Sequence, residues 1–306
     1  MAQTALKLSR GVFFSAGLAM AAFTGGVAFA TAQDKETAPL QDPTALVDVE
    51  TISPDWAKVP PELSLMSSQC SVPAGDLATL VVGLSRTVEK LGSSKQLRIL
   101  AIGSSSTWGA GASSLKRSYP SRLEDILSKV WKGVDLQIMN RGVSGELAAQ
   151  TAHRLLDEIG LAQPDLVLWQ VGTNDALNLV PLEQFTNTVR DTITQVRKRN
   201  IDLVLVGLQY TPKYARHEHY FHIRQALDEI ATSENLLYVR RYRAMEFIAN
   251  TKANLSMMAS DNFHLNDLGY QCMAEHIAQA VVANLFLRRG DRAKTPGGAA
   301  VLGRAN

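Results

Sequence analysis

Short runs of apolar residues alternate with longer stretches in which apolar residues recur every three or four positions, between residues 97 and 287. The runs predict strands at 97–102, 134–140, 165–171, 201–208 and 236–241. The longer stretches predict helices at 119–131, 146–159, 182–199, 218–234 and 266–287. Nearly continuous apolar strands that alternate with helices are typical of a parallel sheet covered on both faces. The pattern therefore predicts a three-layer α/β/α sandwich.

The chain before residue 97 lacks this alternation of strands and helices. Six prolines between residues 31 and 73 break any regular element, and residues 74–91 carry apolar side chains at helical spacing. We therefore expect an amino-terminal extension over residues 31–95 with one helix at 74–91, followed by a domain over residues 96–287. The remaining segment, 288–306, is basic and rich in glycine, and we expect it to be disordered.

The first thirty residues have the pattern of a secretory signal peptide. Lys7 and Arg10 precede an uncharged stretch that ends in "AFA", and "ATA" follows as a second small-residue site. We therefore expect the chain to be exported to the periplasm or the medium and cleaved after Ala30 or Ala32. The alternative is an uncleaved anchor, because about twenty apolar residues can span a bilayer. No later segment is long and apolar enough to do so.

The charge balance indicates which partners to expect, and the cysteine content bears on the redox environment. The 306-residue chain carries a net charge of +2, and without Lys7 and Arg10 it keeps 29 basic residues against 29 acidic ones. This balance argues against a nucleic-acid partner. The two cysteines, Cys70 and Cys272, either pair after export or stay as unpaired apolar side chains. A bond between them would staple the extension onto the last helix.

Loops of glycine and small polar residues follow the first three predicted strands. In a parallel sheet, ligands bind beyond the carboxyl ends of the strands, where the strand order reverses. If the spatial order is 2-1-3, these loops meet around the end of the first strand. Their sequences are "GSSSTWG" (103–109), "NRGVSGE" (140–146) and "GTNDALN" (172–178).

These loops, with one histidine, supply the groups that acyl transfer needs. Ser105 lies at a strand-to-helix turn, where its own N–H can face a developing oxyanion, and Gly145 and Asn174 add further donors. Of the six histidines, only His264 lies in a loop with a carboxylate at a useful offset. Asp261, three residues earlier, can hold Nδ1–H of that histidine and leave Nε2 free to accept the serine proton.

Four blocks together resemble the SGNH (GDSL-like) hydrolases. They occur in the family's order and approximate spacing, within roughly residues 96–287, and Ser104 stands where the family usually has an aspartate. The resemblance implies a flavodoxin-like, five-stranded parallel sheet of order 2-1-3-4-5, and ester hydrolysis without a metal or cofactor. The blocks are "IGSSST", "NRGVSG", "GTND" and "DNFH".

Matched block by block, the resemblance also implies roles for individual residues. Ser105 is expected to be the nucleophile, with His264 and Asp261 as the other members of the triad. The oxyanion hole is expected to consist of the N–H groups of Ser105 and Gly145 and the amide of Asn174.

Two other readings of the polar residues stay open. Ser106 would be the nucleophile if the register of the serine run is off by one. His217, His219 and His222 could suggest a metal site, but on a helix His217 does not align with the face that the other two share. We expect no metal and no cofactor.

The predicted activity is therefore that of an exported serine esterase working through an acyl-enzyme. Its substrate would be an ester of a small molecule, a glycan or a lipid. Removal of acetyl or other short acyl groups from an envelope polysaccharide would suit export. The alternatives are a lipase or arylesterase of broad specificity and a catalytically inactive, glycan-binding envelope protein. Nothing in the sequence indicates the oligomeric state.

Overall fold

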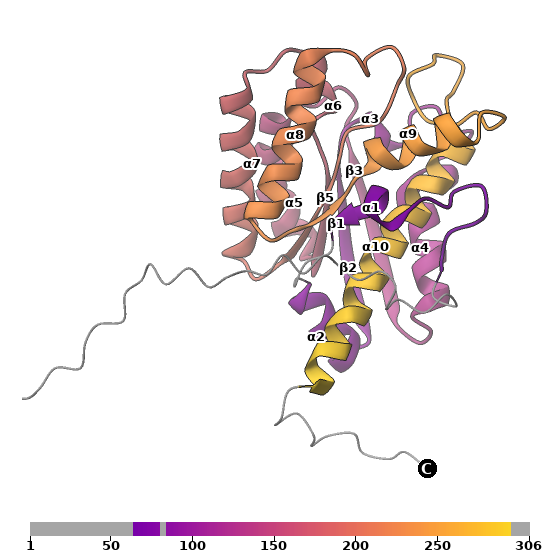
Figure 1. The fold of residues 1–306 in the computed structure, drawn as a ribbon. Helices are drawn as coiled ribbons and strands as arrows, with labels where there is room; N and C mark the ends of the chain where they lie inside the picture. Colours follow the sequence, from indigo (N-terminus) through magenta and orange to yellow (C-terminus); the bar gives the residue numbers. More distant parts are fainter. Residues whose placement is uncertain (1–63, 80–83, 295–306) are drawn as a thin grey trace, which may run out of the picture. The chain divides into compact units, whose positions relative to one another are not determined.

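The computed structural model describes residues 64–79 and 84–294. The predicted signal peptide, most of the extension and residues 295–306 lie outside this range. The described residues contain a mixed sheet of six strands, in the order β1-β6-β5-β4-β2-β3. Figure 1 shows the strands with helices around them. The strands are β1 (Ala78–Thr79), β2 (Gln96–Gly103), β3 (Asp135–Gly142), β4 (Leu166–Gln170), β5 (Asp202–Val206) and β6 (Leu237–Val239).

The five strands β2 to β6 correspond to the predicted ones and pair in parallel. Their order confirms the predicted 2-1-3-4-5 arrangement and the α/β class. The sheet is not purely five-stranded, because β1 adds a short antiparallel strand at the edge of β6. Ala78 pairs there with Val239, and Thr79 pairs with Tyr238.

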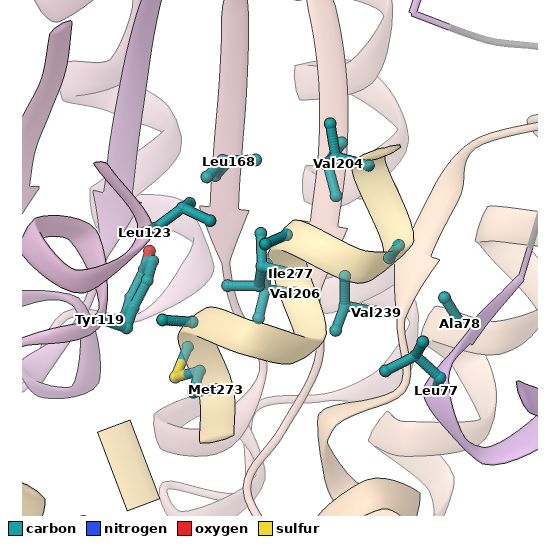
Figure 2. Close-up of a cluster of buried hydrophobic side chains, with 14 of the residues drawn as sticks. Leu77, Ala78, Tyr119, Leu123, Leu168, Val204, Val206, Val239, Met273 and Ile277 are labelled. Carbon is teal, nitrogen blue, oxygen red and sulfur yellow. The ribbon is translucent and has the colours of Figure 1, made fainter. Parts of the chain in front are cut away.

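Helices cover both faces of the sheet. Successive side chains of a strand point to opposite faces, so Ile99 of β2 belongs to one buried cluster and Leu100 to the other. The cluster shown in Figure 2 lies between the sheet and one set of helices. These are α2 (Ser85–Ser93), α4 (Tyr119–Val130), α9 (Arg241–Thr251) and α10 (Asp267–Lys294). The other face is covered by α5 (Ala148–Ala162), α7 (Leu182–Arg197) and α8 (Glu218–Ser233).

Three local predictions are wrong. Residues 74–91 do not form one helix, because β1 separates α1 (Ala74–Leu77) from α2. The unpaired edge of β6 offers backbone hydrogen bonds that outweigh the helical pattern at this point. The closing helix α10 continues to Lys294, so the first part of the predicted disordered tail is helical. Helix α9 was not expected, since Arg240 and Arg241 were assigned to the last strand.

Within the described residues, no helix combines the length and the apolar character needed to cross a bilayer. Asn266 directly precedes α10, and its Oδ1 accepts the N–H of Gly269 at 3.0 Å. The side chain of Asn266 therefore caps the helix.

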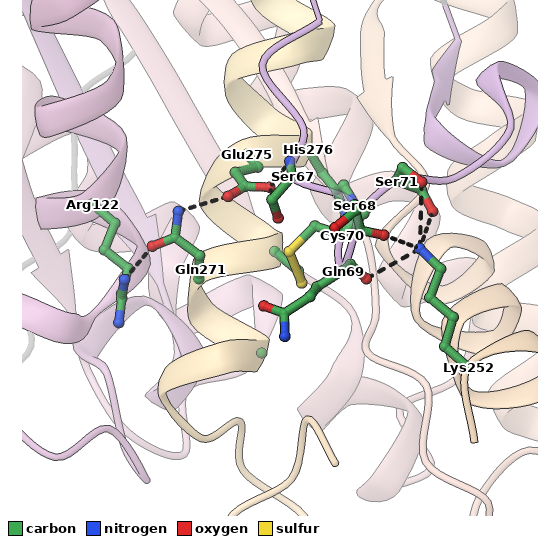
Figure 3. The surroundings of a disulfide bond; sticks show 12 residues. Ser67, Ser68, Gln69, Cys70, Ser71, Arg122, Lys252, Gln271, Glu275 and His276 are labelled. Atoms are coloured by element: carbon green, nitrogen blue, oxygen red, sulfur yellow. Dashed lines mark hydrogen bonds between the residues drawn. A yellow bond between two sulfur atoms is a disulfide. The ribbon is translucent and has the colours of Figure 1, made fainter. Parts of the chain in front are cut away.

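A disulfide between Cys70 and Cys272 fastens the described part of the extension to α10 (Figure 3). It settles the alternative left open by the sequence in favour of pairing. Polar contacts continue along the same helix: the N–H and Oγ of Ser67 donate to Glu275, and the N–H of Leu65 donates to Gln279. Residues 65–72, here called the strap, are therefore held at several successive turns of α10.

We expect the disulfide to contribute about 5 kcal/mol to the free energy of unfolding, since it closes a loop between residues 202 positions apart. Replacing both cysteines by alanine should lower the midpoint of urea denaturation accordingly. The double variant is compared with oxidised and with reduced wild type. An unchanged midpoint would mean that the polar contacts of the strap suffice without the covalent bond.

The strap also contacts a buried histidine. His276 is 2% exposed, and its Nε2 lies 2.6 Å from the carbonyl oxygen of Cys70. Burial lowers the pKa of His276, because desolvation penalises the imidazolium more than the hydrogen bond to Cys70 favours it. The neutral ring therefore donates its Nε2–H to this carbonyl.

This burial predicts a loss of stability in mild acid. The folded-state pKa of His276 lies below the ordinary value of 6.5, so the unfolded chain binds the proton first as the pH falls. The free energy of unfolding should fall below pH 6.5, by up to about 1.4 kcal/mol per pH unit. His276→Gln keeps a donor near the Cys70 carbonyl but does not titrate, and should flatten this part of the profile. Equal slopes for the two proteins, measured by urea denaturation, would contradict the assignment.

Candidate active site

Ser105 begins a short helix, α3 (Ser105–Trp108), directly after β2. Its side chain lies at the carboxyl end of a central strand, and the residue is 8% exposed. The preceding glycine permits a close approach to the neighbouring strand, because a Cβ atom on Gly103 would lie 2.6 Å from the carbonyl oxygen of Gln170. The backbone therefore brings the serine to the point where the ends of β2 and β4 meet.

Gln170 fixes the turn that carries the serine. Its Oε1 accepts the N–H of Ser104 at 3.1 Å and the hydroxyl of Ser104 at 3.0 Å. Thr107 Oγ1 donates to the same oxygen at 3.4 Å. Ser104, which stands at the usual aspartate position of the SGNH family, thus has a defined partner. Gln170 was missed in the sequence, although a polar residue at the end of the apolar run "LVLWQ" is a signal.

The histidine lies on a tight loop before α10. An isolated antiparallel bridge between Met258 and Leu265 closes this loop. Asp261 Oδ1 accepts the backbone N–H groups of Phe263 and His264, both at 2.9 Å. The side chain of the aspartate thus shapes the loop as well as facing the ring.

A continuous chain of hydrogen-bonding contacts joins three of the expected residues. His264 Nδ1 lies 2.6 Å from Asp261 Oδ2. On the other side of the ring, Nε2 lies 3.1 Å from Ser105 Oγ. Both distances are within normal hydrogen-bond range. The structure therefore brings together residues separated by up to 159 positions in the chain.

The carboxyl group of Asp261 stays ionised. The hydrogen bond with the His264 ring is the largest cause, and with the N–H of Phe263 it lowers the pKa of Asp261 to about 2. An ionised carboxylate only accepts hydrogen bonds, so Nδ1 carries the ring proton and Nε2 is left as an acceptor.

The loops with the two remaining predicted donors are fastened to the serine turn and to each other. The N–H of Val143 donates to the carbonyl of Gly103 at 2.9 Å. Asn174 lies in α6 (Thr173–Leu177), and its Nδ2 donates to the carbonyl of Glu146 at 2.8 Å. A primary amide carries two N–H groups, so this side chain can also donate to a ligand. Gly145 has φ of +84°, a left-handed conformation that favours glycine.

Charged side chains hold the residues on either side of Gly145 in place. Arg154 on α5 forms an ion pair with Glu146, with 2.6 Å between Nε and Oε1, and its Nη2 donates to the carbonyl of Arg141. Asp175 accepts the N–H of Ala148 at 2.9 Å, which joins the start of α5 to α6. Burial raises the pKa of Asp175 against the opposing effect of that N–H.

The alternative residues lie elsewhere. Ser106 Oγ faces Gln209 Oε1 at 3.4 Å, whereas His264 contacts Ser105. His217 precedes α8, and His219 and His222 lie on it. Within the part of the chain that the structure describes, no three His, Cys, Asp or Glu side chains gather closely enough to hold a metal ion.

The chain is similar to a protein family, to a curated protein sequence and to solved structures. Residues 69–285 match the model of the non-GDSL lipase-like family. An arylesterase from Vibrio mimicus is 24% identical over 173 residues, which is 56% of this chain and 82% of that protein.

Among solved structures, a two-domain esterase active on acetylated mannans aligns with a TM-score of 0.60 and 19% identity, over 71% of this chain and 58% of that one. An acetylxylan esterase from Geobacillus stearothermophilus, solved as a catalytic mutant, aligns with a TM-score of 0.52 and 18% identity, over 62% of this chain and 94% of that one. At this level of identity the two structures share the fold with this chain.

Proposed function

The chain belongs to the non-GDSL lipase-like family and is a carboxylic ester hydrolase of the SGNH type, and from this premise we propose that it is an exported deacetylase of an envelope polysaccharide. Ser105 is its nucleophile in this proposal. The observation that carries it is the contact chain from Asp261 through His264 to Ser105, with distances of 2.6 and 3.1 Å.

In the first half-reaction, Ser105 Oγ attacks the ester carbonyl carbon while His264 Nε2 accepts the hydroxyl proton. The carbonyl π electrons move to oxygen, and the N–H groups of Ser105 and Gly145 and the amide of Asn174 donate to the resulting oxyanion. Asp261 stabilises the imidazolium that forms. General-base catalysis of this kind contributes about 10²–10⁴-fold to the rate.

The intermediate collapses when the bond to the alcohol oxygen breaks. His264 gives its proton to that oxygen, the alcohol leaves, and the acyl group remains on Ser105. Water then attacks the acyl-enzyme with His264 again as the base. Cleavage of the serine ester releases the carboxylic acid and returns the proton to Ser105 Oγ.

Aromatic side chains beside the histidine support a glycan as the alcohol part of the substrate. The ring of Phe263 lies edge-on to His264, with 4.9 Å between centroids, and Tyr214 lies 6.1 Å from Phe263. Lys213 Nζ lies 5.1 Å from the centre of the Tyr214 ring. The ring faces of Phe263 and Tyr214 are apolar, and the Tyr214 hydroxyl and the Lys213 ammonium add polar donors, a combination that suits a sugar. The activity of the mannan esterase on acetylated glycans points the same way.

Export is supported by the amino-terminal sequence and by the disulfide. Disulfides persist in oxidising compartments such as the periplasm and are rare in the cytosol. The bond between Cys70 and Cys272 fits this environment.

The direct test compares substrates. Purified protein is assayed with p-nitrophenyl esters of increasing acyl length and with O-acetylated oligosaccharides, with released acetate as the readout. The proposal predicts the highest kcat/KM for acetyl esters and acetate release from the glycan. A maximum at long acyl chains would indicate a lipase, and turnover of aryl esters alone would indicate an arylesterase. Glycan binding without turnover or fluorophosphonate labelling would indicate an inactive binding protein.

Tyr214→Ala tests the aromatic surface by itself. Loss of one aromatic contact is worth about 0.5–1.5 kcal/mol, so KM for an acetylated oligosaccharide should rise up to about tenfold. Turnover of p-nitrophenyl acetate, which is too small to need this contact, should change less than about twofold. Tyr214→Phe keeps the ring and should behave as wild type. Equal effects on both substrates would mean that Tyr214 does not contact the glycan.

A further inference from the structure

Arg241 is an arginine buried beneath the active site without a counter-ion. It begins α9, and only 1% of its surface is exposed. No Asp or Glu among the described residues lies within ion-pair distance of its guanidinium, and two of its nitrogens, Nε and Nη1, have no hydrogen-bond partner in that part of the chain. Burial lowers the pKa of Arg241, and the groups that oppose this most are the hydroxyls of Tyr270, Tyr220 and Tyr119, which burial keeps protonated and uncharged.

Such an arginine costs stability. Moving a guanidinium out of water is strongly unfavourable unless hydrogen bonds and an opposite charge compensate for it. An apolar side chain of similar length would fill the same space without this cost. A role other than stabilising the fold is therefore expected for Arg241.

The hydrogen bonds that Arg241 does make point to that role. Its Nη2 donates to Ser106 Oγ at 3.1 Å and to Gln209 Oε1 at 3.0 Å. Gln209, also 1% exposed, donates in turn from Nε2 to the carbonyl of Phe263 at 2.9 Å. Ser106 directly follows the nucleophile, and Phe263 directly precedes the histidine. One buried network thus joins the two loops that must present Ser105 and His264 to each other.

Gln209 is itself held on its other side. Tyr220 OH donates to its carbonyl oxygen at 2.6 Å, and the backbone N–H of Gln209 donates to Thr173 Oγ1 at 3.4 Å. The amide orientation follows from this network, because Oε1 faces a guanidinium that can only donate and Nε2 faces a carbonyl that can only accept. A side chain with acceptors at both ends could not donate to the Phe263 carbonyl.

We propose that Arg241 and Gln209 are positioning residues, which hold the serine turn and the histidine loop in register so that Ser105 Oγ stays within hydrogen-bond distance of His264 Nε2. The inference rests on the function proposed above. Neither residue touches the substrate, so their effect falls on the chemical step and not on substrate binding. A displacement of about 1 Å between catalytic groups can cost on the order of 10²-fold in rate.

Gln209→Glu separates this role from a merely structural one. The new carboxylate gives Arg241 the counter-ion that it lacks, so the melting temperature should stay the same or rise. The carboxylate cannot donate to the Phe263 carbonyl and repels it, so kcat for p-nitrophenyl acetate should fall about 10²-fold while KM changes less than about twofold. Activity and stability thus move apart, which a structural role does not predict. Wild-type kcat in a folded Gln209→Glu protein would overturn the proposal.

A second variant covers the case in which Gln209→Glu does not fold. Ser106→Ala removes one hydroxyl from the network and adds no charge. We expect kcat to fall about tenfold, with KM and melting temperature close to those of wild type. Unchanged kcat in this variant would also overturn the proposal. Arg241→Lys, which keeps the charge, should retain more activity than Arg241→Met.

Thr211→Val serves as the matched control. Thr211 is 1% exposed and lies two residues beyond Gln209, and its hydroxyl has no hydrogen-bond partner among the described residues. This variant should keep wild-type kcat. Failure of the proposed function looks different from failure of this inference: a wild-type protein that hydrolyses no ester and takes up no fluorophosphonate contradicts the function, whereas active wild type and equally active network variants contradict only the positioning roles.

Discussion

Alanine in place of Ser105 should lower kcat for p-nitrophenyl acetate on the order of 10⁶-fold, the size of the loss when a serine triad loses its nucleophile. The acyl-enzyme cannot form without Oγ, and the remaining donors alone give only a small acceleration over water. Covalent labelling by a fluorophosphonate probe should disappear as well. The fold should be unaffected, because the change removes one partly accessible hydroxyl, and the melting temperature checks this.

The neighbouring serine provides the control for the register. Ser106→Ala should still react with the fluorophosphonate, since His264 contacts Ser105 Oγ at 3.1 Å and Ser106 faces Gln209 instead. Loss of labelling in Ser106→Ala, together with its retention in Ser105→Ala, would shift the nucleophile by one residue.

Asparagine at position 261 should lower kcat on the order of 10⁴-fold through the tautomer of the histidine. Asp261 Oδ1 accepts the N–H groups of Phe263 and His264, both at 2.9 Å. An asparagine can satisfy these donors only with its carbonyl oxygen, so its NH₂ group faces Nδ1 of the ring. Nδ1 must then accept, the ring proton moves to Nε2, and Nε2 can no longer take the proton of Ser105.

Asp267→Asn is the matched control for this substitution. Asp267 lies six residues further along and binds the N–H and hydroxyl of Ser113. The control should keep kcat within about tenfold of wild type. If Asp261→Asn retained most of its activity, the histidine would not depend on the carboxylate for its orientation or its tautomer.

Prediction from the sequence worked best where one physical preference dominates. The strands β2, β4, β5 and β6 are recognisable because a strand buried on both faces must be almost entirely apolar. It failed at residues 74–91, where the apolar spacing of a helix competes with the free edge of β6. That edge exists only once the sheet has formed, so no local pattern indicates it.

The candidate active site likewise contains residues that the sequence predicts and residues that only the structure identifies. Ser105, Asp261 and His264, which the structure brings together, were predicted because their loops follow strands or precede the closing helix, and because each block has a recognisable composition. Gln209 and Arg241 were not found, since neither lies in a motif. Their significance comes from burial and from hydrogen bonds between segments that are distant in sequence.

The bond between Cys70 and Cys272 turns 202 positions of sequence into a covalent ring. A single backbone cut inside that ring, for example by a protease at the exposed residues 216–218, leaves both fragments attached to each other. Such a nicked molecule keeps the serine and the histidine in one particle, although they then belong to different polypeptides. On a denaturing gel the two pieces would separate only after reduction.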